Sequence, residues 1–286
     1  MTMSKSDPSA STTLKEAFDL NGRVAIVTGG AGLLGVKHAE AIAELGGIPV
    51  LVDIDAEGAS VHAKDIASRY GVSAIGVACD ITQEAAVAAL NARLLKEMGR
   101  IDILINNAAN NPKVEDGLSS DQFSRLENYP IASWERDIAV GLTGAFLCSR
   151  VFGATMADQG KGVILNIASV YGLIAPDQRL YRVENLKESE QPMKPASYSV
   201  VKAGLIGLTR YLATYWPGRV RVNALAPGGV FDGQPDDFLK RYASAVPMGR
   251  MAHSDEMKGA VAYLVSDASA FANGMTLTVD GGHSVW

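Results

Sequence analysis

Short apolar runs alternate with amphipathic, alanine-rich stretches along most of the chain. The runs are rich in valine and isoleucine, which is typical of strands buried on both faces of a parallel sheet. The stretches between them have helical spacing, as in residues 82–98. This alternation predicts the α/β class, a doubly wound Rossmann-type parallel sheet of about seven strands with helices on both faces. The expected strands are 23–27, 48–53, 72–79, 101–105, 163–167, 220–223 and 276–279.

The pattern also suggests how the chain is divided. Residues 1–19 are rich in Ser, Thr and Asp, so we expect a flexible N-terminal arm there. No composition break follows, so residues 20–286 are expected to form a single domain. Within it, residues 110–130 are polar, and about 171–195 form an inserted loop of prolines and charged residues. A loop of that length inside a compact domain is usually functional or disordered.

Composition changes this picture mainly by exclusion. The chain has 286 residues and a net charge of −5, and no Lys/Arg run stands out, which argues against nucleic acid and anionic membranes as partners. Nothing resembles a signal peptide or an apolar run long enough to span a bilayer, so a cytoplasmic protein is expected. Cys79 and Cys148 fit neither a disulfide framework nor a metal spacing, and the four histidines are scattered, so no metal is expected.

A glycine turn follows the first predicted strand. Gly30-x-Gly32-x-x-Gly35 stands between a strand and a helix, the context in which such glycines cradle a dinucleotide pyrophosphate at a helix N-terminus. Asp53 ends the second strand, where a carboxylate accepts ribose hydroxyls and repels a 2′-phosphate. We therefore expect NAD (NADH), with NADP less likely because of Asp53. The alternatives are a turn without a ligand and, for Asp53, a helix N-cap.

Further polar residues follow the next two strands. Asp80 ends the third run, where adenine would lie in such a sheet, and Asn106-Asn107-Ala108-Ala109 ends the fourth at the same edge. These positions extend the expected nucleotide site along the edge of the sheet.

Tyr198 and Lys202 are four residues apart, so on a helix they lie one turn from each other. A phenol has a pKa of about 10, and a nearby positive charge lowers it. Such a tyrosine can exchange a proton with an alcohol or ketone oxygen near neutral pH. The alternative is an ordinary helix with a half-exposed tyrosine and a solvated lysine, and the spacing alone does not exclude it.

Taken together, these pieces resemble the short-chain dehydrogenase/reductase family, in its single-domain branch. The resemblance covers residues 23–282, with the pieces in family order. They are the glycine turn, Asp80, Asn106 to Ala109, Ala168-Ser169, Tyr198 with Lys202, Asn223 to Gly228, and Val279 to Gly282.

The resemblance implies roles for these residues. Tyr198 would be the general acid/base, Lys202 would hold the nicotinamide ribose, and Ser169 would hydrogen-bond the reacting oxygen. The implied activity is an NAD-dependent oxidoreductase that interconverts a secondary alcohol and a ketone. The implied cofactor site comprises Gly29, Gly30, Gly32, Leu33, Leu34, Gly35, Asp53, Ile54, Asp80, Ile81, Asn107, Ala108, Ala109, Tyr198, Lys202, Pro227, Gly228 and Val230.

Three departures keep other functions open. Leu33 stands where this branch commonly has glycine, and the resulting spacing resembles the extended branch, which supports a lyase or epimerase that uses NAD transiently on a nucleotide sugar. Gly141 aligns with an asparagine that holds a proton-relay water in many members, which leaves room for a non-catalytic NAD-binding regulator. Ser169 and Tyr198 are 29 residues apart, more than is common, because of the inserted loop.

The inserted loop is where we expect substrate specificity. Arg179 and Arg182 could clamp a carboxylate or phosphate, and Tyr181 could stack on a sugar. The alternative is a solvated insertion whose arginines pair with Glu184, Glu188 and Glu190. Residues 175–179, 194–195 and 209–216 resemble a subgroup linked to surface-sugar and nonulosonic acid biosynthesis. The hypothesis is a small polar, sugar-derived substrate, with an acidic group.

The chain also suggests self-association. The helical stretches at about 134–156 and 196–216 are more apolar than one sheet face requires. Family members pair these helices between subunits, so a homo-oligomer, a dimer or tetramer, is expected. The alternative is that both helices only pack on the sheet.

Overall fold

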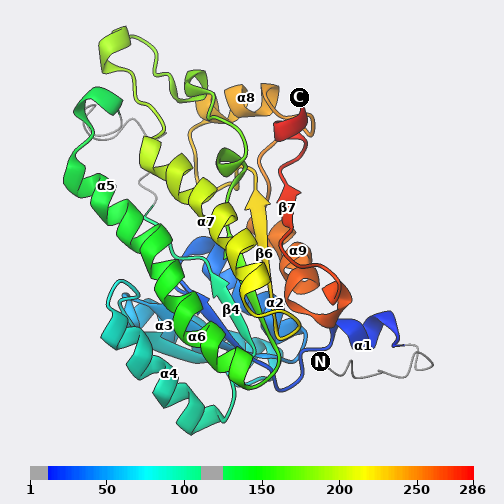
Figure 1. Cartoon of the computed structure of the whole chain (residues 1–286). Coiled ribbons are helices and arrows are strands. Elements are labelled where there is room, and N and C mark those ends of the chain that lie inside the picture. Colours follow the sequence, from blue (N-terminus) through cyan, green and yellow to red (C-terminus); the bar gives the residue numbers. More distant parts are fainter. Residues whose placement is uncertain (1–11, 111–124) are drawn as a thin grey trace.

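A seven-stranded parallel sheet forms the centre of the computed structural model, which describes residues 12–110 and 125–286 (Figure 1). The strand order is β3-β2-β1-β4-β5-β6-β7. The strands are β1 (Val24–Thr28), β2 (Ile48–Asp53), β3 (Ile75–Ala78), β4 (Ile103–Asn106), β5 (Gly162–Ile167), β6 (Val220–Pro227) and β7 (Thr276–Val279). The structure confirms the predicted α/β class and its doubly wound sheet.

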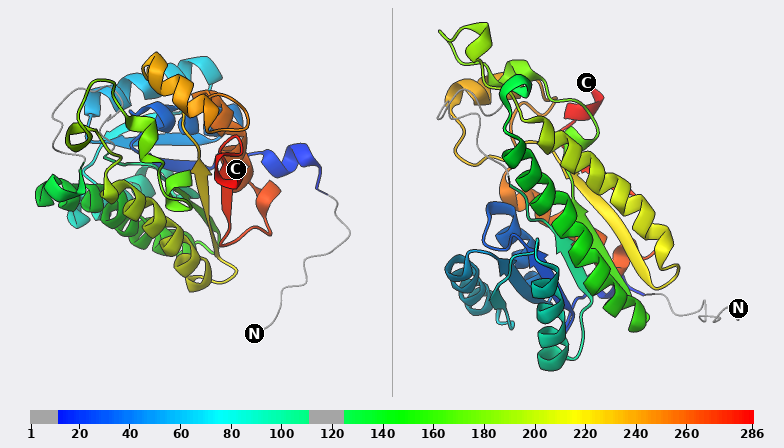
Figure 2. Two further views of the ribbon diagram at one scale, coloured as in Figure 1. Left: turned by 90° about the horizontal axis from the view of Figure 1, so that it is seen from above. Right: turned by 60° about the vertical axis from the view of Figure 1, so that its left-hand side comes forward.

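Helices cover both faces of this sheet, each over its own apolar core (Figure 2). On one face pack α2 (Leu33–Glu44), α3 (Ala56–Tyr70) and α9 (Lys258–Val265). On the other pack α4 (Glu84–Met98), α6 (Gly144–Asp158) and α7 (Ala196–Tyr215). Three further α-helices are α1 (Leu14–Phe18), α5 (Ile131–Ile138) and α8 (Asp236–Ser244). The strands are buried on both sides as a result, which is why they read as continuous apolar runs.

Short helical turns fill several of the connections. They are η1 (Leu126–Asn128), η3 (Val170–Gly172), η4 (Gln178–Tyr181), η5 (Glu188–Glu190), η6 (Ser254–Met257), η7 (Asp267–Ser269) and η8 (His283–Val285), and η2 (Ala139–Thr143) is a π-helical segment between α5 and α6.

The strand order places the predicted ligand residues at one edge. β1 lies between β2 and β4, with Val27 opposite Ile105 and Thr28 opposite Val52. The connection after β1 runs through α2 on one face of the sheet, and the connection after β4 leads to α6 on the other face. A crevice opens between them outside the carboxyl ends of the strands. The glycine turn after β1 and the segment after β4 therefore meet.

Two segments differ from the sequence-based expectation. The expected N-terminal arm lies mostly outside the described residues, but residues 14–18 form α1, because Thr13 caps the helix and Glu16 bonds back to the Thr13 amide. The inserted loop folds through η3, η4 and η5, and it packs Leu180 and Tyr181 against α8. Figure 1 shows the insertion beside α8, above the end of the sheet.

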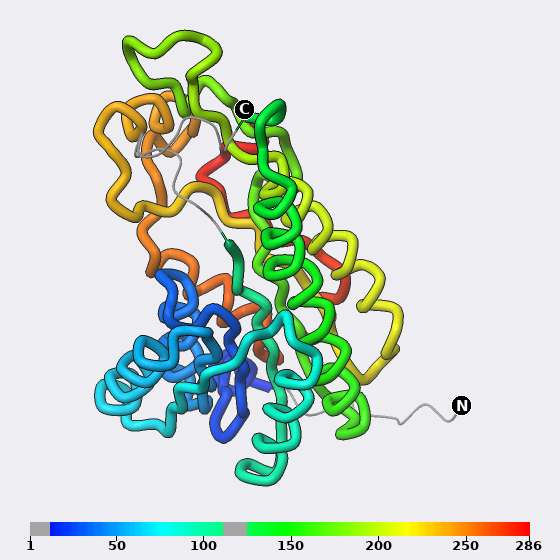
Figure 3. The backbone as a smooth tube through the Cα atoms, turned by 90° about the vertical axis from the view of Figure 1, so that its left-hand side faces the viewer, coloured from blue at the N-terminus to red at the C-terminus, as the bar shows by residue number. Residues whose placement is uncertain are grey.

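Within the described part of the chain, one helix is long and apolar enough to cross a membrane by length and composition, the continuous helix Ile131–Asp158. Figure 3 shows it lying alongside α7. Cys148, Phe152 and Met156 are buried in the core under the sheet. Packing on the sheet therefore accounts for much of its apolar character.

Candidate active site

Two adjoining hollows run along the carboxyl edge of the sheet. The first, which we name the glycine-turn groove, has a volume of about 590 Å³ and extends over the ends of β1, β2 and β3. The second, the tyrosine cavity, has a volume of about 280 Å³ and lies between β5, β6 and α7. Both are lined by Leu33, Leu34, Asn107 and Ala109, so they form one continuous crevice.

The glycine turn is built by close backbone approaches. Gly29 has a φ of +64°, and a Cβ there would lie 2.9 Å from the Cα of Ala108. A Cβ on Gly30 would lie 2.8 Å from the Cα of Leu51, and one on Gly35 would lie 2.0 Å from the Gly29 carbonyl oxygen. Gly30 and Gly35 do not line either hollow. They allow the turn to pack on β2 and α2, while Gly29 and Gly32 line the groove.

The N-terminus of α2 opens into this crevice. Its N-cap is Gly32, and none of the described side chains caps the helix. Helix N-termini have amide N–H groups without partners inside the helix, and these bind phosphate oxygens well. Leu33 and Leu34, the first residues of the helix, line both hollows. The groove therefore suits a dinucleotide, with its pyrophosphate at this helix end.

Asp53 lies in the groove, but its carboxylate is held by the backbone. It accepts hydrogen bonds from the amides of Ala31, at 3.0 Å, and Asp55, at 3.1 Å. The N-cap of α3 is Asp55, whose side chain accepts from the Gly58 amide. Asp53 therefore ties the glycine turn to the end of β2, a role the sequence did not suggest. The neighbouring Ile54 also lines the groove, with its side chain exposed.

The far end of the groove contains Asp80 and Ile81. The Asp80 carboxylate accepts from the amide and hydroxyl of Thr82, at 2.9 and 2.7 Å, and these bonds lower its pKa. Asn107 lines the crevice and donates to the carbonyls of Thr28 and Gly29. Both side chains shape the groove wall.

The adjacent Asn106 has a different role. Its side chain is buried and donates to Ser149 on α6 and to Asn166 on β5. Of the Asn106–Ala109 segment, Asn107, Ala108 and Ala109 line the groove.

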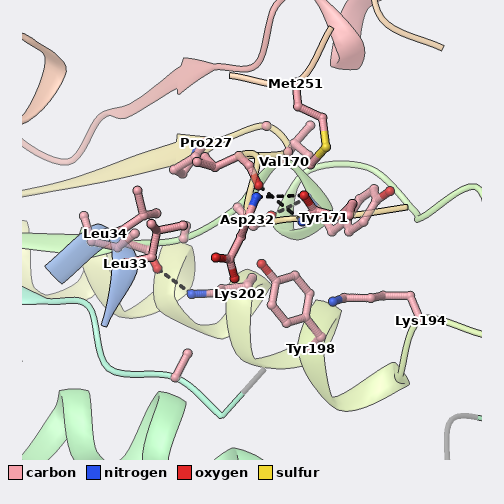
Figure 4. Close-up of a pocket in the computed structure, with 18 of the residues that line it drawn as sticks. Leu33, Leu34, Val170, Tyr171, Lys194, Tyr198, Lys202, Pro227, Asp232 and Met251 are labelled. Atoms are coloured by element: carbon pink, nitrogen blue, oxygen red, sulfur yellow. Dashed lines mark hydrogen bonds between the residues drawn. The ribbon is translucent and has the colours of Figure 1, made fainter. Parts of the chain in front are cut away.

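The three expected catalytic residues, Ser169, Tyr198 and Lys202, line the tyrosine cavity together. Figure 4 shows Tyr198 and Lys202 side by side there. Lys202 is buried, and its ammonium donates to the Ile167 carbonyl at 2.8 Å and lies 5.7 Å from the centre of the Tyr198 ring. Burial, and then the positive charge of Lys194, lowers the pKa of Lys202 to about 8. The Ser169 oxygen accepts from the Tyr171 amide at 3.2 Å. A tyrosine, a lysine and a serine thus converge from α7 and the end of β5.

A buried carboxylate fixes the start of α7 near Tyr198. Asp137 accepts hydrogen bonds from Asn110 at 2.7 Å, from Tyr129 at 2.5 Å and from Ser197. These bonds connect α5, the segment after β4 and the first turn of α7. No local pattern in the sequence indicates this network, because its members are far apart along the chain.

Several residues that line the cavity are not among the predicted site residues. Of these, Lys194 has the charged group nearest Tyr198. Its side chain is 8% exposed, and its ammonium lies 4.2 Å from the centre of the Tyr198 ring. Asp232, after β6, also points into the cavity (Figure 4). Burial raises the pKa of Tyr171 to about 12, so this second phenol stays protonated. Other lining residues outside the prediction are Gln234, Phe238, Tyr242 and Met251.

Of the three residues expected to bind substrate, Arg179, Tyr181 and Arg182, only Tyr181 lines the cavity. Tyr181 lines it and packs 5.5 Å from Phe238, centre to centre. Arg179 is ion-paired with Asp177 at 2.8 Å, Arg182 is paired with Glu188, and neither lines the cavity. The structure favours the alternative in which the arginines pair with acidic neighbours within the insertion. Pro227, Gly228 and Val230 do line the cavity.

Gly141 lies in the π-helical segment and faces α7. A Cβ at this position would lie 2.6 Å from Cγ1 of Val201. An asparagine there would require the Val201 side chain or α7 itself to shift. π-Helical segments are frequent at functional sites. The close approach of α7 explains why this position is a glycine.

Comparisons with known proteins give the family. The short chain dehydrogenase profile matches residues 23–181, and the enoyl-(acyl carrier protein) reductase profile matches residues 186–284. The chain belongs to the short-chain dehydrogenase family. The predicted family resemblance is confirmed.

Several relatives are named for the same type of reaction, the dehydrogenation of a sugar alcohol. An NADP-dependent mannitol dehydrogenase of Alternaria alternata is 34% identical over 96% of this chain and 97% of that protein. A D-threitol dehydrogenase of Mycolicibacterium smegmatis is 34% identical over 94% and 95%, respectively. Among solved structures, a gluconate 5-dehydrogenase from Burkholderia cenocepacia in complex with NADP and tartrate has a TM-score of 0.82 at 28% identity, with 95% and 99% coverage. These names give no support to the resemblance to the nonulosonic acid subgroup.

The comparisons also correct the cofactor expectation. The sequence predicts NAD, with Asp53 as the argument against NADP, but the relatives include NADP-dependent enzymes and a structure that holds NADP. The expectation was therefore wrong. In the structure each carboxylate oxygen of Asp53 accepts one backbone amide, so this side chain also tethers the glycine turn.

Proposed function

We propose that this enzyme reversibly oxidises a secondary alcohol of a polyol or related sugar-derived substrate, with a nicotinamide dinucleotide as the hydride carrier and Tyr198 as general acid/base. One observation carries the proposal. Ser169, Tyr198 and Lys202 line one cavity that adjoins the groove at the uncapped N-terminus of α2. A dinucleotide bound along this crevice would bring its nicotinamide end to the tyrosine.

The side chains would divide the proton chemistry between them. When bound, the nicotinamide supplies hydride acceptance and donation. Tyr198 would take the proton of the substrate hydroxyl, and Ser169 would donate a hydrogen bond to the same oxygen. Ser169 suits this role because its oxygen already accepts from the Tyr171 amide, which leaves its hydrogen for another acceptor. Lys202, fixed by the Ile167 carbonyl, would favour the phenolate with its positive charge.

The relatives support the substrate class and the reaction type. Mannitol and D-threitol dehydrogenases act on linear polyols by name, and both cover nearly the whole of this chain. These names favour an oxidoreductase over the lyase, the epimerase and the non-catalytic regulator. For the cofactor, the relatives that use or hold NADP support NADP(H).

The test is an absorbance assay for the reduced cofactor, with NADP or NAD and a panel of four- to six-carbon alditols and the corresponding aldonic acids. Wild-type protein should form NADPH with at least one substrate of this panel and show a higher kcat/KM for NADP than for NAD. Tyr198→Phe should lower kcat by about 10²–10⁴-fold, the range for loss of a general acid/base. A matched control is Tyr263→Phe on α9, outside both hollows, which should keep full activity.

Three results would contradict the proposal. Product without net NADPH would indicate a lyase or epimerase, and cofactor binding without any turnover would indicate a regulator. Unchanged kcat in Tyr198→Phe would remove the tyrosine from the chemistry. A higher kcat/KM for NAD would contradict the NADP assignment alone.

We also propose that the chain forms a homo-oligomer through α6 and α7. Their outer faces leave large side chains exposed on a single chain: Phe146, Val200, Tyr211 and Tyr215. Light scattering coupled to size exclusion tests this, and a Tyr211→Asp, Tyr215→Asp double variant should dissociate the assembly. A monomeric wild-type protein would contradict the proposal.

A further inference from the structure

The inserted segment brings a lysine to the substrate end of the active site. Lys194 precedes α7, and its backbone amide donates to the Gln178 side chain at 2.8 Å. That bond connects the two ends of the insertion. The Lys194 side chain is thereby directed into the tyrosine cavity, where it is almost completely buried.

Lys194 and Lys202 lie on opposite sides of Tyr198 (Figure 4). The Lys202 ammonium is held by the Ile167 carbonyl, on the side of the glycine turn. The Lys194 ammonium lies 4.2 Å from the centre of the tyrosine ring, on the side of the insertion. A substrate whose reacting oxygen meets Tyr198 would therefore extend past Lys194 on the side away from the cofactor.

The charges that line the tyrosine cavity do not balance. Among the described lining residues, Lys194 and Lys202 are cationic, and Asp232 is the one carboxylate. Two cations and one anion leave a net charge of +1. A cavity lined by an excess of one sign of charge attracts ligands of the opposite sign. The arginines of the insertion do not alter this balance, because they lie outside the cavity.

We infer that Lys194 binds a carboxylate of the substrate, so that the preferred substrates are polyhydroxy acids and not neutral polyols. This inference rests on the proposed function and narrows its substrate class. A carboxylate at the far end of a short hydroxy acid would pair with the Lys194 ammonium while a hydroxyl faced Tyr198. Charge-assisted hydrogen bonds of this kind are short and strong.

The experiment compares acids with neutral polyols of equal length. We would measure kcat/KM for D-gluconate against D-glucitol, and for D-galactonate against galactitol, at saturating NADP. Wild-type protein should prefer the acids by at least tenfold. Lys194→Met, which keeps an apolar chain over the ring, should lower kcat/KM for the acids roughly 10- to 100-fold, mainly through KM, as expected for loss of a charged hydrogen bond. Because the Lys194 charge lies beside Tyr198, the variant should also change the alditol values, but by a smaller factor, since alditols lack the anion that Lys194 binds. The diagnostic is therefore the ratio of kcat/KM for acids to kcat/KM for alditols, which should fall about tenfold or more.

Two further variants make the result specific. Lys194→Arg keeps the charge and should retain a preference for acids. Lys187→Met removes an exposed lysine of the same insertion, paired with Glu190, and should change neither substrate class. Thermal midpoints of all variants show whether each is folded. If Lys194→Met is unfolded, loss of the acid preference in Lys194→Arg, with alditol turnover kept, would still overturn the carboxylate role.

The outcomes separate this inference from the proposed function. Alditols oxidised in preference to the acids, or an equal loss for both classes in Lys194→Met, would overturn the inference and leave the proposed function standing. The opposite case is an acid that binds but is not oxidised, and calorimetric titration of D-gluconate into the NADP complex tests for it. If the acid binds through Lys194 but neither acids nor alditols are turned over, the proposed function is refuted and the inference is supported. If the acid is neither bound nor oxidised, the inference is overturned.

Discussion

Gly35 offers the sharpest test of how the glycine turn is built. In Gly35→Ala the new Cβ would lie 2.0 Å from the Gly29 carbonyl oxygen and 2.8 Å from its carbon. An ordinary contact between carbon and oxygen needs more than 3 Å, so the turn and α2 must move apart by about 1 Å. The Gly29 carbonyl accepts from the Gly32 amide and the Asn107 side chain, and both bonds lie on the part that must move.

The expected cost follows from these contacts. Overpacking costs about 1–3 kcal/mol, and two weakened hydrogen bonds add about 1 kcal/mol each at most. Alanine in a helix regains up to about 1 kcal/mol over glycine. The free energy of unfolding should therefore fall by roughly 2 kcal/mol, which corresponds to a drop in Tm of about 4–8 °C for a chain of this size. Because the N-terminus of α2 moves with the turn, the Kd for NADP should rise by about tenfold or more.

Differential scanning calorimetry and titration of NADP measure the two effects. Gly259→Ala is the matched control, since it lies in α9, is exposed, and has no atom within 4 Å of the added Cβ. It should keep both Tm and Kd or gain slightly in Tm. If Gly35→Ala keeps the wild-type Tm and Kd, the close packing of the turn has no bearing on stability or binding, and the reasoning is refuted.

Three further predictions concern other parts of the crevice. Burial lowers the pKa of Lys202 to about 8 in the folded state, so the unfolded state binds more protons between pH 8 and the ordinary lysine pKa of 10.5. The free energy of unfolding of wild type relative to Lys202→Met should therefore rise over that range by up to about 3 kcal/mol, and a flat difference would contradict this. Asp53→Ala should weaken NAD and NADP binding by similar factors, because it removes the tether of the glycine turn. Asp55→Ala, which removes only the α3 cap, should leave the binding of both cofactors unchanged. If titrations show tighter binding of NADP alone in Asp53→Ala, Asp53 discriminates between NAD and NADP and the prediction is wrong. Gly141→Asn should lower the free energy of unfolding by about 1–3 kcal/mol, because the new side chain overpacks Val201. In a double-mutant cycle measured by denaturant unfolding, adding Val201→Ala should recover most of this loss, and additive effects would rule out the contact.

Much of the fold could be predicted from the sequence, because its signals are local. Strands buried on both faces, such as residues 163–167, produce continuous apolar runs, and helices between them keep their own spacing. Strand ends were less certain: β3 begins at Ile75 and not at residue 72, and β4 ends at Asn106 and not at residue 105. These ends depend on register with neighbouring strands, which no local pattern encodes.

The candidate site also has parts with a local sequence pattern and parts that depend on long-range packing. The glycine turn and the pair Tyr198 and Lys202 have short fixed spacings, so sequence reasoning could place them in one crevice. Asp53 shows where such reasoning stops. Its position at the end of β2 was predicted, but its two bonds to backbone amides depend on how the glycine turn folds back over that strand.

The inserted segment is where long-range packing decides most. Arg179 and Arg182 are the charges that stand out in its sequence, yet each finds an acidic partner within the insertion and stays at the surface. Lys194 has no distinguishing local pattern, and it becomes part of the cavity because Gln178 holds its backbone and α7 begins directly after it. A charged residue in an insertion therefore indicates substrate chemistry only once the path of the insertion over the site is known. Here that path selects the lysine next to Tyr198 and leaves the arginines outside.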